Sequence, residues 1–126
     1  MGPIAHYAND HFLAPGGWLS AANTGTSTAN IVHARHASGV DVVFAVAEDI
    51  GSVPLTVVGT EGWLTAEHEV NFVSFKIMFG KFVEYLRTGK MPFAFEQTVE
   101  LIKLIVAGTR SREEQGRTVM LSEIGP

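Results

Sequence analysis

The spacing of apolar residues changes near the middle of the chain, from a strand-like pattern to a helix-like one. Short apolar or alternating runs between Gly-containing or polar turns are typical of β-strands, and they occupy Trp18 to Ala22, Asn30 to His36 and Val40 to Glu48. Two more short runs flank Gly59-Thr60-Glu61-Gly62 within Pro54 to Glu67. Because glycine reaches the positive φ angles of a tight reversal, this stretch predicts a β-hairpin.

Helical spacing begins after the predicted hairpin. From Asn71 to Thr88 the apolar residues recur at intervals of three and four, and the stripe consists of Phe72, Phe75, Phe79, Phe82 and Leu86. A second helix is predicted from Phe95 to Arg112, and Arg117 to Leu121 has the pattern of a last strand. Burial of a Phe side chain contributes about 1.5–3 kcal/mol, so the first helix is expected to anchor the sheet.

These elements predict an α+β fold for one domain that spans residues 1–126. We expect an open, mostly antiparallel β-sheet of about five or six strands, with the two C-terminal helices packed on one face. The segment Val40 to Glu48 is nearly continuous in apolar residues. A strand with one buried face alternates, whereas a strand buried on both faces need not. Both faces of the sheet are therefore expected to be covered.

Composition narrows the classes of function. The chain has 126 residues, no cysteine and a formal net charge of −4. The absence of cysteine excludes disulfides and Cys-based zinc sites. Scattered Lys and Arg residues disfavour nucleic acid as a partner. No stretch has the length of a membrane span or the layout of a secretory signal, so a cytoplasmic protein without a membrane partner is expected.

Few residues are candidates for chemistry. On an extended strand His33 and Arg35 share a face and His36 lies on the other, so the two histidines are not expected to bind one metal. His33 and Arg35 are either structural surface residues or contacts to a ligand. His6 and Asp10 share a face only if their segment is helical, so they form either a polar surface segment or an acid/base pair. No Ser or Cys lies in a recognisable nucleophile elbow, which disfavours a hydrolase.

The second half of the chain resembles a known family of proteins. The segments that carry the resemblance are GTEGWLTAE, then FVEYLRTGK, then SREEQGR before the last strand. In this order and spacing they are similar to the C-terminal domain of the Gfo/Idh/MocA oxidoreductases, the family of glucose–fructose oxidoreductase and inositol dehydrogenase. The similarity covers roughly residues 40–121 and is weak before them.

The resemblance implies a role within a larger enzyme. Family members have an N-terminal Rossmann domain for NAD or NADP, followed by an α+β domain with an open sheet. That sheet carries helices on one face, and its other face commonly mediates oligomerisation and helps to hold a sugar, polyol or similar substrate. This chain lacks the Rossmann domain, its Gly-rich motif and a Glu-Lys-Pro segment. It is therefore not expected to bind dinucleotide or to be catalytic by itself, and no catalytic residue is assigned.

Two hypotheses follow from the sequence. The first is a substrate-binding and oligomerisation domain of an NAD(P)-dependent oxidoreductase. It is expected to form a dimer through the open sheet face, with His33, Arg35, His6 and Asp10 as candidate contacts to a small-molecule substrate. The alternative is a stand-alone oligomeric α+β module that binds a small ligand without catalysis.

Overall fold

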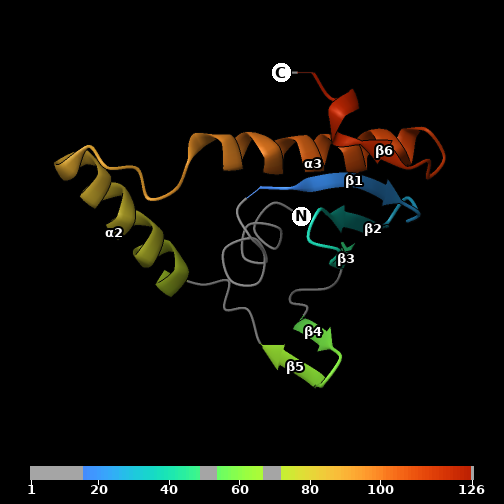
Figure 1. The fold of residues 1–126 in the computed structure, drawn as a ribbon, viewed down its shortest axis with the longest axis horizontal. Helices are drawn as coiled ribbons and strands as arrows, with labels where there is room; N and C mark the ends of the chain where they lie inside the picture. The colour runs from blue at the N-terminus through green and yellow to red at the C-terminus, as the bar shows by residue number, and fades with distance from the viewer. Residues whose placement is uncertain (1–15, 49–53, 67–71, 126) are drawn as a thin grey trace. The chain divides into compact units, whose positions relative to one another are not determined.

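The computed structural model describes residues 16–48, 54–66 and 72–125 (Figure 1). The chain divides into two units: Met1–Glu48 with Phe95–Pro126, and Asp49–Ala94. Each unit is described by itself. His6 and Asp10 lie outside the described residues, so their predicted roles remain predictions.

The first unit is a four-stranded antiparallel sheet with a helix on one face. The strand order is β3-β2-β1-β6. Its elements are β1 Trp18–Asn23, β2 Ala29–His36, β3 Asp41–Ala47, α3 Phe95–Glu113, β6 Val119–Met120 and the short 3₁₀ helix η1 Leu121–Glu123. The contacts of α3 are mainly with β1 and β6. The predicted α+β class with an antiparallel sheet is confirmed.

Alternation along the strands decides which side chains reach the core. In β2, Val32, Ala34 and His36 are buried, while Ile31, His33 and Arg35 are exposed. The buried set faces α3, whose Leu101, Leu104 and Ala107 join the same core. The buried hydrophobic residues of this unit are Trp18, Ala21, Val32, Ala34, Phe44, Leu101, Leu104, Ala107, Val119 and Leu121. The predicted division of β2 into two faces is confirmed.

The end of α3 is fixed to β1 by a buried hydrogen bond. Ser111 is fully buried, and its Oγ accepts a hydrogen bond from the backbone N–H of Asn23 at 2.8 Å. Gly116 then turns the chain with φ +86°, and its N–H donates to the carbonyl of Ser111. A Cβ at this position would lie 3.3 Å from the carbonyl oxygen of Asn23. Glycine is needed here because the conformation is left-handed and the neighbouring strand is close.

The second face of the sheet is exposed within the first unit, and its expected cover by a second copy stays a prediction. Val43 in β3 is 63% exposed and Ile31 in β2 is 45% exposed. Phe44, between Val43 and Ala45 in sequence, is 2% exposed because it points toward α3. The apolar run in β3 thus combines one buried face with one apolar but exposed face. Within the described part of the first unit, taken by itself, no element buries that second face.

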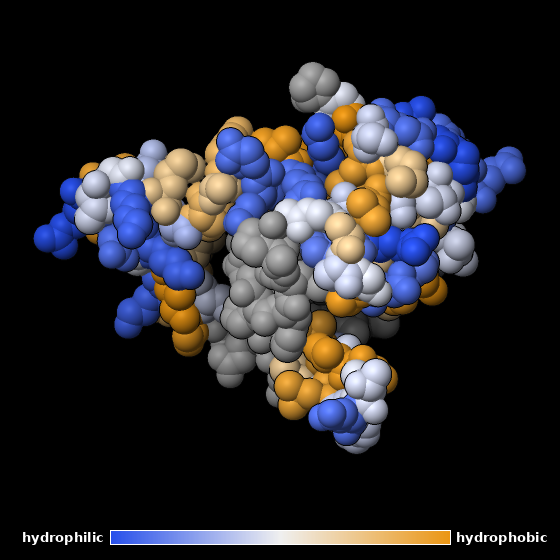
Figure 2. Space-filling model, in the orientation of Figure 1, coloured by the Kyte–Doolittle hydropathy of each residue, from blue (hydrophilic) through white to orange (hydrophobic). Residues whose placement is uncertain are grey.

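The second unit contains a hairpin and a helix. The strands β4 Leu55–Gly59 and β5 Gly62–Ala66 form their own two-stranded sheet, so the six strands do not share one sheet as expected. Gly59 pairs with Gly62 at the reversal, and Gly62 has φ +153°. The predicted hairpin is confirmed. Hydrophobic residues reach the molecular surface around this hairpin (Figure 2).

The helix of the second unit, α2 Phe72–Thr88, has the predicted end and cap, and Asn71, the predicted first residue, lies outside the described residues. Gly89 has φ +68°, and its N–H donates to the carbonyl of Tyr85 at 2.8 Å. No side chain of α2 is buried, although it carries the Phe stripe. Phe75 and Phe79 instead stack on each other, with ring centroids 6.1 Å apart. Anchoring of the sheet by α2 concerns two different units and stays a prediction, whereas α3 packs on the sheet within the first unit.

Candidate functional site

Three side chains of β2 and β3 meet on the exposed face of the sheet. The Nε2 atom of His33 lies 3.0 Å from Oδ1 of Asp41, and the Nε atom of Arg35 lies 3.7 Å from the same oxygen. We call His33, Arg35 and Asp41 the open-face cluster. All three side chains are at least half exposed. Two of them, His33 and Arg35, are candidates from the sequence, and the structure brings them together through Asp41.

The turn between β2 and β3 sets this arrangement. The N–H of His36 donates to the carbonyl of Val40, and the N–H of Gly39 donates to the carbonyl of His36. Gly39 has φ +86°, which a residue with a side chain adopts only with strain. This reversal places Arg35 opposite Asp41. Side chains directly opposite on antiparallel strands are close enough to interact.

Sequence reasoning missed Asp41, although the signal was present. Once the turn is placed at residues 37–39, counting outward pairs Arg35 with Asp41 and His33 with Val43. An acidic residue opposite a basic one then predicts a cross-strand ion pair.

The open-face cluster has apolar neighbours. Ile31 and Val43 lie on the same face of the sheet and are exposed. Exposed ion pairs contribute about 0–1 kcal/mol to stability, so the fold does not depend on this one. Imidazole, guanidinium and carboxylate groups together supply hydrogen-bond donors and acceptors. These groups suit a ligand that carries hydroxyl groups.

His36 lies on the opposite face, as predicted, and is buried. Its Nε2 is 2.7 Å from the carbonyl oxygen of Gly16, and its Nδ1 is 2.8 Å from Oγ of Ser38. The carboxylate of Glu100 in α3 accepts hydrogen bonds from the N–H groups of Gly17 and Trp18. These contacts fix the start of β1 and do not meet the open-face cluster.

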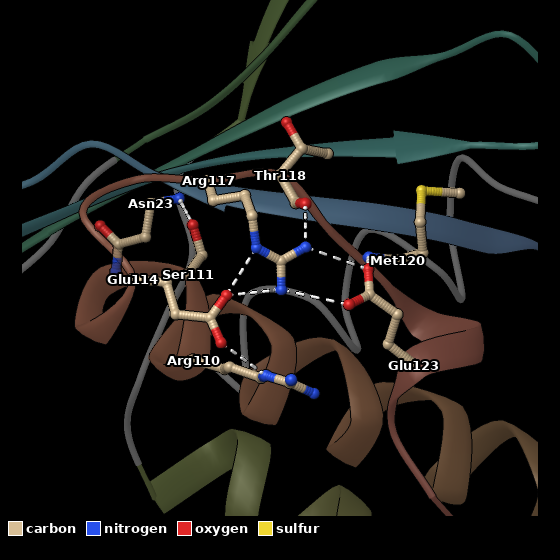
Figure 3. Close-up of polar contacts among 8 residues, drawn as sticks. All are labelled: Asn23, Arg110, Ser111, Glu114, Arg117, Thr118, Met120 and Glu123. Atoms are coloured by element: carbon tan, nitrogen blue, oxygen red, sulfur yellow. Dashed lines mark hydrogen bonds and ion pairs between the residues drawn. The ribbon is translucent and has the colours of Figure 1, made fainter.

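An ion-pair network joins the end of α3 to β6 and η1 (Figure 3). The guanidinium of Arg117 lies between Glu114 and Glu123, and Arg110 pairs with Glu114. Hydrogen bonds from Arg110 and then Arg117 hold the pKa of Glu114 below its ordinary value. The hydrogen bond from Arg117 does the same to the pKa of Glu123. In turn, Glu123 and Glu114 raise the pKa of Arg117.

This network is structural in character. Every acidic group in it already has an arginine partner, and the N–H of Met120 also donates to Glu123 at 2.9 Å. Among the residues that the structure describes, no group of three or more His, Cys, Asp or Glu side chains is placed to hold a metal ion. The open-face cluster therefore remains the best candidate for ligand contact.

Comparison with known proteins adds no relative. No family model, curated protein or solved structure matches this chain. The resemblance to the Gfo/Idh/MocA family accordingly stays a prediction from the sequence. In the described ranges, no helix combines the length and apolar character that crossing a bilayer requires.

Proposed function

We propose that this chain is the substrate-binding and oligomerisation domain of an NAD(P)-dependent oxidoreductase that acts on a sugar, polyol or related small substrate. The observation that supports it is the contrast between the two faces of the sheet. One face is closed by α3, and the other presents the open-face cluster beside exposed apolar residues. The order of hairpin, Phe-rich helix, second helix and last strand also agrees with the resemblance in the sequence.

The cluster would recognise hydroxyl groups in this proposal. Arg35 supplies N–H donors, Asp41 supplies carboxylate acceptors, and His33 supplies either according to its tautomer. Asp41 orients both basic side chains, because both approach the same oxygen atom. The exposed side chains of Ile31 and Val43 lie on the same face as the cluster and are available to a second copy of the chain.

The nicotinamide cofactor would be bound by another domain. Dinucleotides bind at the carboxyl ends of parallel strands beside a Gly-rich turn. The strands described in this chain pair only in antiparallel fashion. The described strands lack that arrangement, and in this proposal the chain holds the substrate and a second copy of itself.

A second copy is the proposed cover for the exposed sheet face. Exposed apolar side chains that adjoin one another favour association. Ile31 and Val43 are diagonal neighbours on one face of the β2–β3 pair, since Ile31 pairs with Ala45 and Val43 with His33. Packing of two such faces would form a dimer, with the open-face clusters at the edge of the contact.

Titration of the isotope-labelled chain with sugars and polyols, followed by amide NMR, tests the substrate role. We expect shift changes confined to β2 and β3, and their loss in Arg35→Gln. Glu48→Gln serves as a control for charge, because Glu48 lies just beyond β3 and outside the cluster. Binding elsewhere on the chain, or no binding by any member of the panel, would contradict the proposed site.

The intact mass of the protein made by its native host separates the two hypotheses. A mass above that of the 126-residue chain, by about the 100–200 residues of another domain, supports the oxidoreductase. A mass equal to that of the chain supports the stand-alone ligand-binding module.

A further inference from the structure

A bulge in β1 decides which face of the sheet Ser20 occupies. Trp18 pairs with His36, whereas Ser20 pairs with Arg35, so one residue of β1 is extra between these two pairs. In a regular register Ser20 would lie opposite Ala34, on the face that packs against α3. Bulges re-aim side chains in this way. Here the bulge turns Ser20 to the open face.

Ser20 completes a row of polar side chains across three strands. Arg35 in β2 lies opposite Ser20 in β1 on one side and opposite Asp41 in β3 on the other. Side chains directly opposite on antiparallel strands have Cβ atoms about 4.5–5.5 Å apart. A molecule bound to the guanidinium of Arg35 is therefore within reach of the hydroxyl of Ser20.

Both groups have hydrogen-bonding capacity to spare. Ser20 is 4% exposed, and among the described residues its side chain makes no hydrogen bond. Polar side chains at such buried positions generally have a partner. The Nε atom of Arg35 lies 3.7 Å from Asp41, which is beyond hydrogen-bond distance. Within the described ranges, no hydrogen bond comes from this guanidinium.

We propose that Ser20 and Arg35 bind the carboxylate of a sugar acid, while Asp41 binds one of its hydroxyl groups. This inference rests on the proposed function and narrows its substrate class. A guanidinium only donates hydrogen bonds, and it binds carboxylates through two parallel N–H groups. A serine hydroxyl can donate to the same carboxylate, whereas Asp41 only accepts. Donors on the β1 side and an acceptor on the β3 side match a carboxylate with hydroxyl groups next to it.

The charges along this row permit a bound anion. Asp41 is the acidic partner of Arg35, and its Oδ1 is also 3.0 Å from Nε2 of His33. On the far side of Ser20, the opposite residue is the uncharged Met120 of β6. A carboxylate between Ser20 and Arg35 is thus separated from Asp41 by the positively charged guanidinium.

NMR titration of the wild-type chain with matched compounds tests the inference. Glucose is compared with glucuronate and galactose with galacturonate, and acetate represents a carboxylate without hydroxyl groups. We expect the two uronates to bind about tenfold more tightly than their parent sugars. They should also add the amide of Ser20 to the shift changes in β2 and β3. Acetate should bind more weakly than either uronate.

Two variants on the same face of β1 isolate the hydroxyl of Ser20. Ser20→Ala should remove most of the preference for uronates and leave binding of the parent sugars unchanged. Ala22→Ser adds a hydroxyl at the next position on that face, opposite His33, and should retain the wild-type preference.

The outcomes distinguish this inference from the proposed function. Uronates that bind no more tightly than their parent sugars would overturn the inference alone, as would a Ser20→Ala variant with the wild-type preference. Acetate that binds as tightly as the uronates would overturn the assignment to a sugar acid. If no sugar and no sugar acid binds, both the inference and the proposed function are contradicted. If Ser20→Ala does not fold, the comparison on the wild-type chain decides.

Discussion

The two faces of the four-stranded sheet differ in what covers them, although the same strands supply both. Phe44 and Val43 are neighbours in β3, yet Phe44 is 2% exposed and Val43 is 63% exposed. The first packs under α3 and belongs to the core, whereas the second lies beside the open-face cluster. Apolar character along a strand therefore predicts burial only where another element of the fold packs against that face. On the face without such an element, the same residue type becomes a candidate for binding.

The largest expected effect is on the covered face. Phe44→Ala should lower the free energy of unfolding by about 3–5 kcal/mol, because it opens a cavity under α3. Val43→Ala changes the adjacent residue on the other face and should cost well under half of that. Urea denaturation of both variants at low protein concentration provides the measurement. Equal losses would mean that the two faces are equally buried.

The hydrogen bond between α3 and β1 should give the next largest effect. Ser111→Ala leaves the buried N–H of Asn23 without an acceptor, and the expected cost is about 1–3 kcal/mol. Thr109→Ala on the same helix is the matched control. Its hydroxyl bonds only to the carbonyl of Ile105 at an exposed position, so its cost should stay within about 0.5 kcal/mol. A neutral Ser111→Ala variant in thermal or urea unfolding would argue against this attachment of α3.

On the open face, removal of a charge should affect ligand binding more than stability. Asp41→Asn weakens the contacts to His33 and Arg35, and exposed pairs of this kind contribute about 0.2–1 kcal/mol. The same variant should reduce binding of the sugar or polyol found by NMR, because both basic groups lose their common partner. A large loss of stability with unchanged ligand binding would contradict the assignment of ligand binding to the open face.

The smallest effect is expected from the ion pairs at the end of α3. The folded-state pKa values of Glu114 and Glu123 are lowered, so these carboxylates stabilise the fold above the ordinary pKa range of glutamate. That contribution is lost as the pH falls through the lowered values. Glu114→Gln should therefore flatten the acid side of the melting-temperature profile slightly. Because the network is exposed, 1 M salt should remove most of the difference between variant and wild type.

Local patterns predicted much of the fold. Alternation in β2 placed His33 and Arg35 on one face and His36 on the other, and the structure agrees. Glycines predicted the hairpin at Gly59 to Gly62 and the end of α2 at Gly89, where backbone geometry depends on the residue itself. These features depend on neighbours in sequence, so one sequence contains the necessary information.

Features that depend on distant parts of the chain were not predictable in the same way. Within the first unit, the side chains buried against the sheet belong to α3, including Leu104 and Ala107, although the Phe stripe lies on α2. Hydrophobic spacing indicates that a helix packs against another element, but it does not indicate which element. The contribution of Asp41 to the open-face cluster depends on the strand register. The hydrogen bond from the N–H of Asn23 to Ser111 joins residues 88 positions apart.

Sedimentation equilibrium of the wild-type chain and Val43→Glu tests the central claim, which is that the open sheet face binds a second copy. Protein concentrations from about 1 to about 100 μM bracket an affinity in the micromolar range. We expect a dimer for the wild type and a monomer for Val43→Glu. The unfolding free energy of the variant should equal that of the wild-type chain at a concentration low enough to dissociate the dimer. A wild-type chain that stays monomeric throughout, or a Val43→Glu variant that dimerises as strongly as the wild type, would contradict the claim.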